Sequence, residues 1–158
     1  MFRSIRRKKK EISLDLGKQL LHENRIGVLA VNGEDGYPYC MPLNYYYDEE
    51  NNKVYFHGAR AGYKSDMLKL SDKVCFTVYG KESVKDLEWA PYCKSVILFG
   101  RCHLLENNAE TMALLKTLAM KYYPSEEAAD EEIAHDGKAV QVFELEIEHM
   151  TAKEIQEK

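Results

Sequence analysis

A short segment bounded by two glycines carries the residues of this sequence that are best suited to chemistry. His57 and Gly58 end a strand-like run, and Lys64 follows Gly62 at the start of an apparent helix. Glycines allow backbone N–H groups to approach a ligand closely, and the N-terminus of a helix favours an anion. The combination indicates a site for a phosphate attached to a flat ring system, although the spacing also fits an ordinary strand-to-helix connection with an exposed lysine.

Three other chemistries do not fit the residue spacing. A nucleotide P-loop needs four residues between its glycines and a lysine directly after the second, whereas three residues separate Gly58 from Gly62 and Lys64 is not adjacent. The five histidines are dispersed and no H-E-x-x-H or C-x-x-C spacing occurs, so no metal site is predicted. No G-x-S-x-G elbow is present, and Cys93 has no neighbouring base that the sequence identifies, which argues against a hydrolase.

The elements that must position the glycine-bounded segment are two strands and a short helix. Residues 39–47 and 53–58 have the character of strands, and the Asp- and Asn-rich turn between them is typical of a hairpin. A further strand over 26–31 would complete a three-strand meander. A helix is predicted over 64–70.

The rest of the chain predicts a mainly β fold with inserted helices. Ser13 could cap the first helix, but apolar residues spaced by four from Ile12 favour a helix over 10–24. Gly100 is expected to form a bulge or bend. The remaining predicted elements are strands at 73–79, 94–105 and 140–147, a helix at 109–121, and a short helix and loop at 125–136. The predicted fold class is therefore α+β, with roughly six strands in a closed or nearly closed barrel.

Composition and charge narrow the class of protein. Apolar residues make up 45% and charged residues 30% of the 158 residues, which predicts one domain over 1–158 with a basic arm at 1–10 and a charged tail at 154–158. The net charge of −4 argues against nucleic-acid binding. No apolar run approaches the ~20 residues of a membrane span, and none follows the basic start as a secretory signal requires. Four cysteines without a C-x-x-C pair fit reduced thiols in a cytoplasm.

Three segments of the sequence resemble one known family. They are Met41-Pro-Leu-Asn-Tyr45, Tyr55-Phe-His-Gly58 together with Lys64, and Tyr92-Cys-Lys-Ser-Val96 running into Phe99-Gly100. They are similar to the pyridoxamine 5′-phosphate oxidase-like superfamily of FMN-binding split-barrel proteins, and most similar to its nitroimidazole-resistance (Nim-type) branch. The resemblance implies a split β-barrel, FMN as the cofactor, and a homodimer with the flavin in the groove between subunits.

The resemblance also implies roles for individual residues. The segment from Met41 to Tyr45 would line the flavin ring through main-chain groups, and His57 would lie beside the ring. Lys64 would bind the phosphate, with a tyrosine preceding it where other branches have arginine. The full set of implied cofactor-binding residues is Met41, Pro42, Leu43, Asn44, Tyr45, Phe56, His57, Gly58, Tyr63, Lys64, and, from the partner subunit, Lys94 and Ser95.

The resemblance implies a flavin-dependent oxidoreductase of the nitroreductase type. A reduced nicotinamide would supply electrons, a small flat acceptor such as a nitroaromatic would receive them, and His57 would act as the proton donor. The C-terminal segment with Arg and Trp that grips the vitamin phosphate in the vitamin-forming oxidases is missing here, so the fold and the flavin are better supported than that substrate. The alternatives are a non-enzymatic flavin or haem binder, and a split-barrel protein that uses a deazaflavin.

Overall fold

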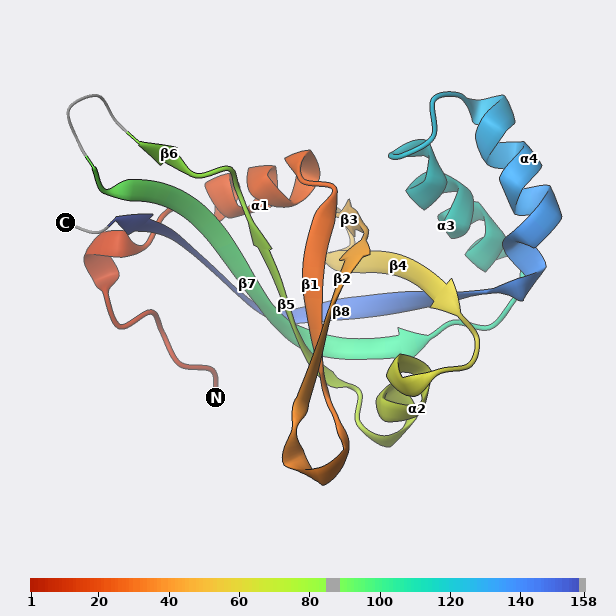
Figure 1. The fold of residues 1–158 in the computed structure, drawn as a ribbon, viewed down its shortest axis with the longest axis horizontal. Coiled ribbons are helices and arrows are strands. Elements are labelled where there is room, and N and C mark those ends of the chain that lie inside the picture. Colours follow the sequence, from red (N-terminus) through yellow and green to blue (C-terminus); the bar gives the residue numbers. More distant parts are fainter. Residues whose placement is uncertain (85–88, 157–158) are drawn as a thin grey trace.

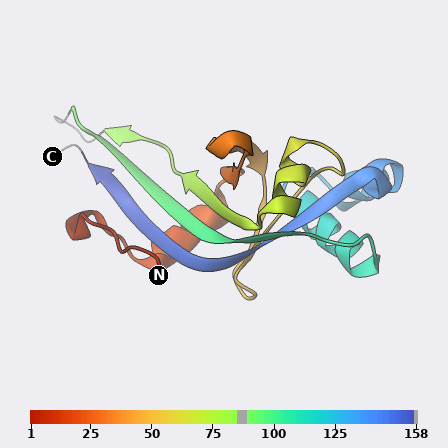
Figure 2. The same ribbon diagram turned by 90° about the horizontal axis from the view of Figure 1, so that it is seen from below.

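One curled antiparallel sheet forms the body of the molecule. A computed structural model describes residues 1–84 and 89–156. Its strands pair in the order β2-β1-β5-β7-β8-β4-β3, with β6 beside β7, to make an eight-stranded sheet. Figure 2 shows β7 and β8 arching together across the length of the molecule. The fold is a split barrel of the α+β class, mainly β.

The bounds of the strands follow the apolar segments of the sequence. The strands are β1 (Ile26–Asn32), β2 (Pro38–Asn44), β3 (Tyr46–Asp48), β4 (Lys53–Ala59), β5 (Lys73–Tyr79), β6 (Ser83–Val84), β7 (Pro91–Leu104) and β8 (Val140–Gln156). Alternate residues face the core, as the period of two in a strand requires. In β5, for example, Val74, Phe76 and Val78 are buried.

The described residues form four α-helices that lie around the sheet (Figure 1). They are α1 (Leu14–Glu23), α2 (Tyr63–Leu70), α3 (Ala109–Met120) and α4 (Glu126–Asp136), with short 3₁₀ turns at Lys8–Lys10, Glu34–Gly36 and Gly137–Ala139. Leu20 and Leu21 of α1 join the hydrophobic core, and α3 packs with α4 at one end of the sheet. Within the described ranges, none of the helices combines the length and the apolar content that crossing a membrane requires.

A single residue, Tyr45, joins β2 to β3, which lie at opposite ends of the strand order. The Tyr45 side chain is fully buried, with its hydroxyl donating to the Leu21 carbonyl at 2.7 Å and its ring edge-on to Phe76. The Tyr45 N–H donates to the Tyr122 hydroxyl at 2.8 Å, and that hydroxyl lies 2.5 Å from the Tyr45 carbonyl oxygen and 2.9 Å from that of Arg25. Because the two ends of the sheet meet at Tyr45, the sheet must curl into a barrel.

A bulge divides the long β7–β8 pairing into two halves. The register passes from Phe99 opposite His149 to Gly100 opposite Ile147, so Glu148 is the extra residue. A Cβ at Gly100 would collide with the Glu146 carbonyl oxygen. The bulge predicted at Gly100 is therefore confirmed, and β8 supplies its extra residue.

The sequence predicts several elements accurately. The strand at 73–79 and the helix at 64–70 match β5 and α2 to within one residue. The mainly β class with inserted helices is confirmed, and the structure has eight strands where roughly six were predicted.

Four predictions about individual elements are wrong. The first helix begins at Leu14, since the Ser13 hydroxyl accepts from the Leu16 N–H and caps it, so the start near residue 10 is incorrect. The hairpin across residues 48–52 is confirmed as β3–β4, and the pairing of 26–31 with the preceding part of the 39–47 strand is confirmed as β1–β2. The continuous three-strand meander is nevertheless incorrect, because the 39–47 strand divides at Tyr45 and β2 does not pair with β4 among the described residues. The expected tail at 154–158 belongs to β8 as far as residue 156. Residues 126–136 form a full helix rather than a short helix and loop.

Replacing Tyr122 with Phe should lower the free energy of unfolding by ~1–3 kcal/mol, because it leaves the Tyr45 N–H without its acceptor. Urea denaturation would measure the loss. Tyr123→Phe is a matched control, since the Tyr123 hydroxyl makes no hydrogen bond among the described residues. Equal stability of the two variants would show that the Tyr122 hydroxyl does not hold the β2–β3 connection.

Candidate functional site

Lys64 lies in the first turn of α2 with its ammonium group over two stacked aromatic rings. Its Nζ is 4.4 Å from the centre of the Phe143 ring and 5.3 Å from that of Phe56, and these rings stack 5.1 Å apart. Partial burial lowers the pKa of Lys64. Among residues 1–84 and 89–156, no carboxylate forms an ion pair with it. Lys64 is therefore a half-buried cation without a counter-ion.

The two glycines that bound this segment serve different purposes. A Cβ at Gly58 would lie 2.6 Å from the Lys64 Nζ, so a larger residue there would displace the ammonium group from its position against β4. Gly62 has φ of 134°, a conformation that favours glycine, and immediately precedes α2. No side chain in the described part of the chain caps α2, which leaves the N–H groups of its first turn available to an anion beside Lys64.

The predicted ring-binding segment lies on β2, at one end of the strand order. Met41 and Leu43 pack against the core, whereas Pro42 and Asn44 are exposed. The Asn44 side chain donates to the Arg25 carbonyl at 2.8 Å. Because β2 has a paired neighbour on one side only, backbone groups on its other edge are free of sheet hydrogen bonds. This edge lies near β4 without pairing to it, and the gap between them is the split of the barrel.

His57 lies on β4 at a pocket between the sheet and the α3–α4 pair. The pocket has a volume of about 290 Å³. Its other lining residues are Asn44, Leu115, Leu118, Ala119, Tyr122, Tyr123, Glu132, Ile133, Asp136, Gly137 and Val140. Partial burial, and then the positive charge of Lys64, lower the pKa of His57. The imidazole is therefore mostly neutral at pH 7.

Three predicted cofactor residues have side chains that hold the fold together. Tyr45 and Phe56 are fully buried in the core. Tyr63 packs edge-on against Tyr39, with ring centres 4.8 Å apart, and its hydroxyl accepts from the Glu34 N–H at 2.8 Å. Only the main-chain groups of these residues and, for Tyr63, an exposed part of the ring are therefore available to contact a cofactor.

Lys94 and Ser95 lie far from Lys64 within one chain. Both are near the start of β7, whereas Lys64 covers Phe143, which pairs with Leu104 at the end of β7. The nine residue-to-residue steps from Ser95 to Leu104 correspond to about 30 Å of strand. Lys94 lines a separate cavity with Glu23 and Gly80, and Ser95 lines another pocket. The structure thus brings together the predicted site residues of β2, β4 and α2 but not these two.

The helical wall of the His57 pocket was not predicted from the sequence. The sequence predicts only that Leu115, Ala119 and Tyr122 lie at helical spacing in an amphipathic helix, and that Ile133 belongs to a short surface helix and loop. Helical spacing identifies an apolar face but not the element that it meets.

Within the part of the chain that the structure describes, no group of three or more His, Cys, Asp or Glu side chains is arranged to hold a metal ion.

Comparison with known families finds one match. The model of the family described as pyridoxamine 5′-phosphate oxidase matches residues 18–154, which is most of the chain. No curated protein is detectably similar in sequence.

Several solved structures share the fold at low sequence identity. A Bacteroides thetaiotaomicron protein, provisionally assigned to 5-nitroimidazole antibiotic resistance, is 19% identical with a TM-score of 0.76, over 91% of this chain and 85% of its own. An FAD-binding protein from Mesorhizobium loti is 21% identical with a TM-score of 0.67, and the match covers 92% of this chain and 97% of that protein. The FAD and haem binding protein from Mycobacterium smegmatis is 19% identical with a TM-score of 0.73, and the match covers 95% of this chain and 74% of that protein. At these identities the likeness establishes the fold.

Replacing Lys64 with Met should raise the pKa of His57 toward its ordinary value of ~6.5, because a neighbouring positive charge is removed. NMR titration of the imidazole would measure the change, with Lys69→Met on the exposed side of α2 as control. Below pH ~6.5 the unfolded chain binds more protons at His57 than the folded protein does, so this residue makes folding less favourable as the pH falls. A His57 pKa that does not respond to the Lys64 substitution would contradict the coupling.

Proposed function

Since the chain belongs to the pyridoxamine 5′-phosphate oxidase family, we propose that it binds FMN along the split between β2 and β4. The observation that carries this proposal is Lys64, a half-buried cation without a counter-ion beside the uncapped N-terminus of α2. A phosphate group would supply the missing negative charge and accept hydrogen bonds from the free N–H groups. The FAD-binding proteins among the similar structures support a flavin as the class of cofactor.

The residues present fit a flavin with one phosphate. The unpaired edge of β2 offers backbone donors and acceptors to the polar side of a flat ring, and Pro42 removes one donor there. Lys64 is the only cationic residue in the first turn of α2, because Tyr63 precedes it. One cation and one helix N-terminus suit the monophosphate of FMN better than the pyrophosphate of FAD. A purified protein with flavin absorption bands, releasing FMN on denaturation, would meet this expectation, and a Soret band would favour the haem-binding alternative.

We further propose that the protein is an oxidoreductase of the nitroreductase type. Bound flavin supplies the electron chemistry. The pocket beside His57 has about 290 Å³, close to the lower limit for small-molecule sites, and would hold a small flat acceptor such as a nitroaromatic. His57 would deliver a proton to that acceptor. Its lowered pKa makes the imidazolium a stronger acid but a less populated one, so the rate should rise as the pH falls toward this pKa.

The proposal includes a homodimer with the flavin shared between subunits. Lys94 and Ser95 lie about 30 Å of strand away from the Lys64 region in one chain, so only a second copy could bring them to the same flavin. A reduced nicotinamide is the proposed electron donor. All four cysteines are free, which supports the proposed location in a reducing cytoplasm.

Lys64→Ala should raise the Kd for FMN about 10- to 100-fold, because a charge-assisted contact with a phosphate contributes ~1.5–3 kcal/mol. Binding of riboflavin, which lacks the phosphate, should change little. Fluorescence titration of flavin-free protein gives both constants, with Lys69→Ala as a control on the same helix. An equal loss of affinity for FMN and riboflavin would show that Lys64 does not contact the phosphate.

His57→Ala should slow the reduction of a nitroaromatic by ~10²-fold, the scale of a lost general acid. Stopped-flow mixing of pre-reduced protein with the acceptor measures this rate. The flavin content should remain near that of the wild type, because Lys64 and the β2 backbone are unchanged. His135→Ala is the control, since that side chain is exposed on α4 outside the pocket.

Two results would count against these roles. A His57→Ala variant as fast as the wild type would make His57 a structural residue only. A wild-type protein that transfers electrons to none of a panel of flat acceptors would favour the non-enzymatic flavin-binding alternative.

A further inference from the structure

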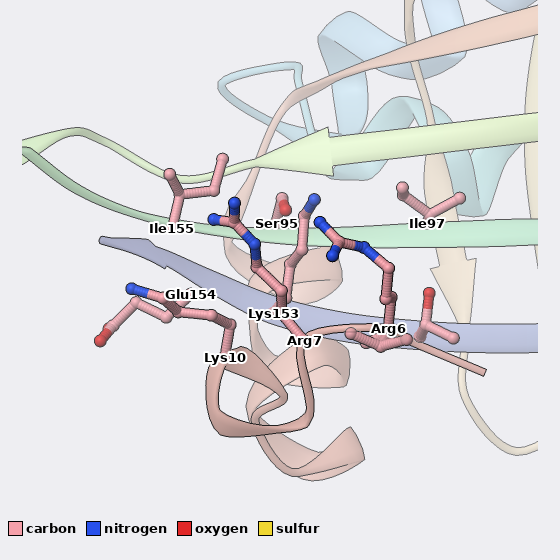
Figure 3. A pocket seen from close by; sticks show the side chains of 10 residues that line it. Arg6, Arg7, Lys10, Ser95, Ile97, Lys153, Glu154 and Ile155 are labelled. Atoms are coloured by element: carbon pink, nitrogen blue, oxygen red, sulfur yellow. The ribbon is translucent and has the colours of Figure 1, made fainter. Parts of the chain in front are cut away.

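A second pocket lies where the N-terminal arm crosses the outer face of the β7–β8 pair (Figure 3). Its volume is about 420 Å³. We refer to it as the arm pocket. Its lining residues are Ile5, Arg6, Arg7 and Lys10 from the arm, Ser95 and Ile97 from β7, and Thr151, Lys153, Glu154 and Ile155 from β8.

The arm pocket is strongly cationic. Figure 3 shows the side chains of Arg6, Arg7 and Lys153 converging around Ser95, whereas Glu154 is directed away on the side of Lys10. Among residues 1–84 and 89–156, no carboxylate forms an ion pair with Arg6, Arg7 or Lys153. Three like charges gathered in one concave site repel one another. A bound anion would offset this repulsion, because its negative charge attracts all three groups.

Ser95 gives independent evidence that a partner is missing. It is 8% exposed, and its hydroxyl is buried without any hydrogen-bond partner in the described structure. Buried hydroxyl groups are rarely left unpaired, because each such group costs ~1–3 kcal/mol of lost hydration. The hydroxyl lies beneath the exposed side chains of Arg6 and Arg7, which can turn aside to admit a ligand.

We propose that the arm pocket binds the phosphate or pyrophosphate group of a nucleotide-type small molecule. Two guanidinium groups offer paired donors that match phosphate oxygens, and the Lys153 ammonium and the Ser95 hydroxyl add single donors. Ile97 and Ile155 provide apolar surface for the organic part of the ligand. The pocket has the size of a small-molecule site, which favours such a ligand over a nucleic acid or a membrane surface.

Two sources of this phosphate chemistry are compatible with the pocket. One is the phosphate of a flavin held by a second copy of the chain, and the other is a separate dinucleotide such as the electron donor. The assignment of an anion site rests on the arm pocket itself and does not depend on flavin binding at Lys64. The two sources differ in one respect, since only the first makes the arm pocket unavailable once FMN is bound.

Isothermal titration of inorganic pyrophosphate into the full chain, with and without saturating FMN, tests the proposal. Arg6→Gln/Arg7→Gln should weaken pyrophosphate binding at least 10-fold. Arg3→Gln/Lys9→Gln removes the same charge from the same arm outside the pocket and is the matched control. Ser95→Ala should weaken binding ~3- to 10-fold while the unfolding temperature stays equal or rises, because an unpaired buried hydroxyl is removed.

The outcomes separate the two sources. One outcome is that pyrophosphate still binds when the protein is saturated with FMN, and that the Arg6/Arg7 substitutions abolish this binding. This outcome would support a separate nucleotide. Loss of pyrophosphate binding on FMN saturation, together with a 10-fold weaker FMN but unchanged riboflavin affinity in the Arg6/Arg7 variant, would support the flavin phosphate. If the Arg6/Arg7 variant matched the Arg3/Lys9 control for both pyrophosphate and FMN, the anion site would be disproved.

Discussion

The connection through Tyr45 is the constraint on which the rest of the structure depends. β2 and β3 lie at opposite ends of the strand order, and one residue separates them in the chain. A flat sheet would hold these ends far apart, so the sheet has to curl until its edges meet. The buried hydroxyl of Tyr45 and the hydroxyl of Tyr122 hold the meeting point from two sides. The barrel is thus closed through the covalent chain, and β2 and β4 need not pair.

This mode of closure explains why the candidate site lies where it does. A barrel closed by hydrogen bonds would have no free edge, whereas here β2 keeps an unpaired edge near β4, and Asn44 of β2 lines the same pocket as His57. The α2 helix enters directly after β4 and places Lys64 over that same region. Leaving a half-buried ammonium without a counter-ion costs stability. In the proposed function, the split, the free helix N-terminus and this cation would together hold an anion with a flat ring attached.

Local patterns account for what the sequence predicts well. The strand over 73–79 and the helix that follows Gly62 are predicted from neighbours in the chain, and both elements agree with the structure. Pairing between strands that are distant in the chain leaves no such pattern. The local β1–β2 and β3–β4 pairings are therefore predicted correctly, whereas the pairing of β4 with β8 is not. Residues 154–156 are assigned to a tail by composition, yet they pair with Lys94, Cys93 and Tyr92 at the start of β7. The approach of Arg7 to Ser95 spans 88 positions of sequence and was likewise not predictable.

The bulge at Glu148 connects the two candidate sites. On β8, odd-numbered residues such as Leu145 and Ile147 face the core before the bulge, and the even-numbered Ala152 is buried after it. One extra residue therefore reverses which side chains point outward. Without it Lys153 would face the apolar core, where an unpaired ammonium group is strongly unfavourable. With it, one strand keeps Phe143 beneath Lys64 at one end and presents Lys153 to the arm pocket at the other, so the same β8 supports a cationic site on each half of the barrel.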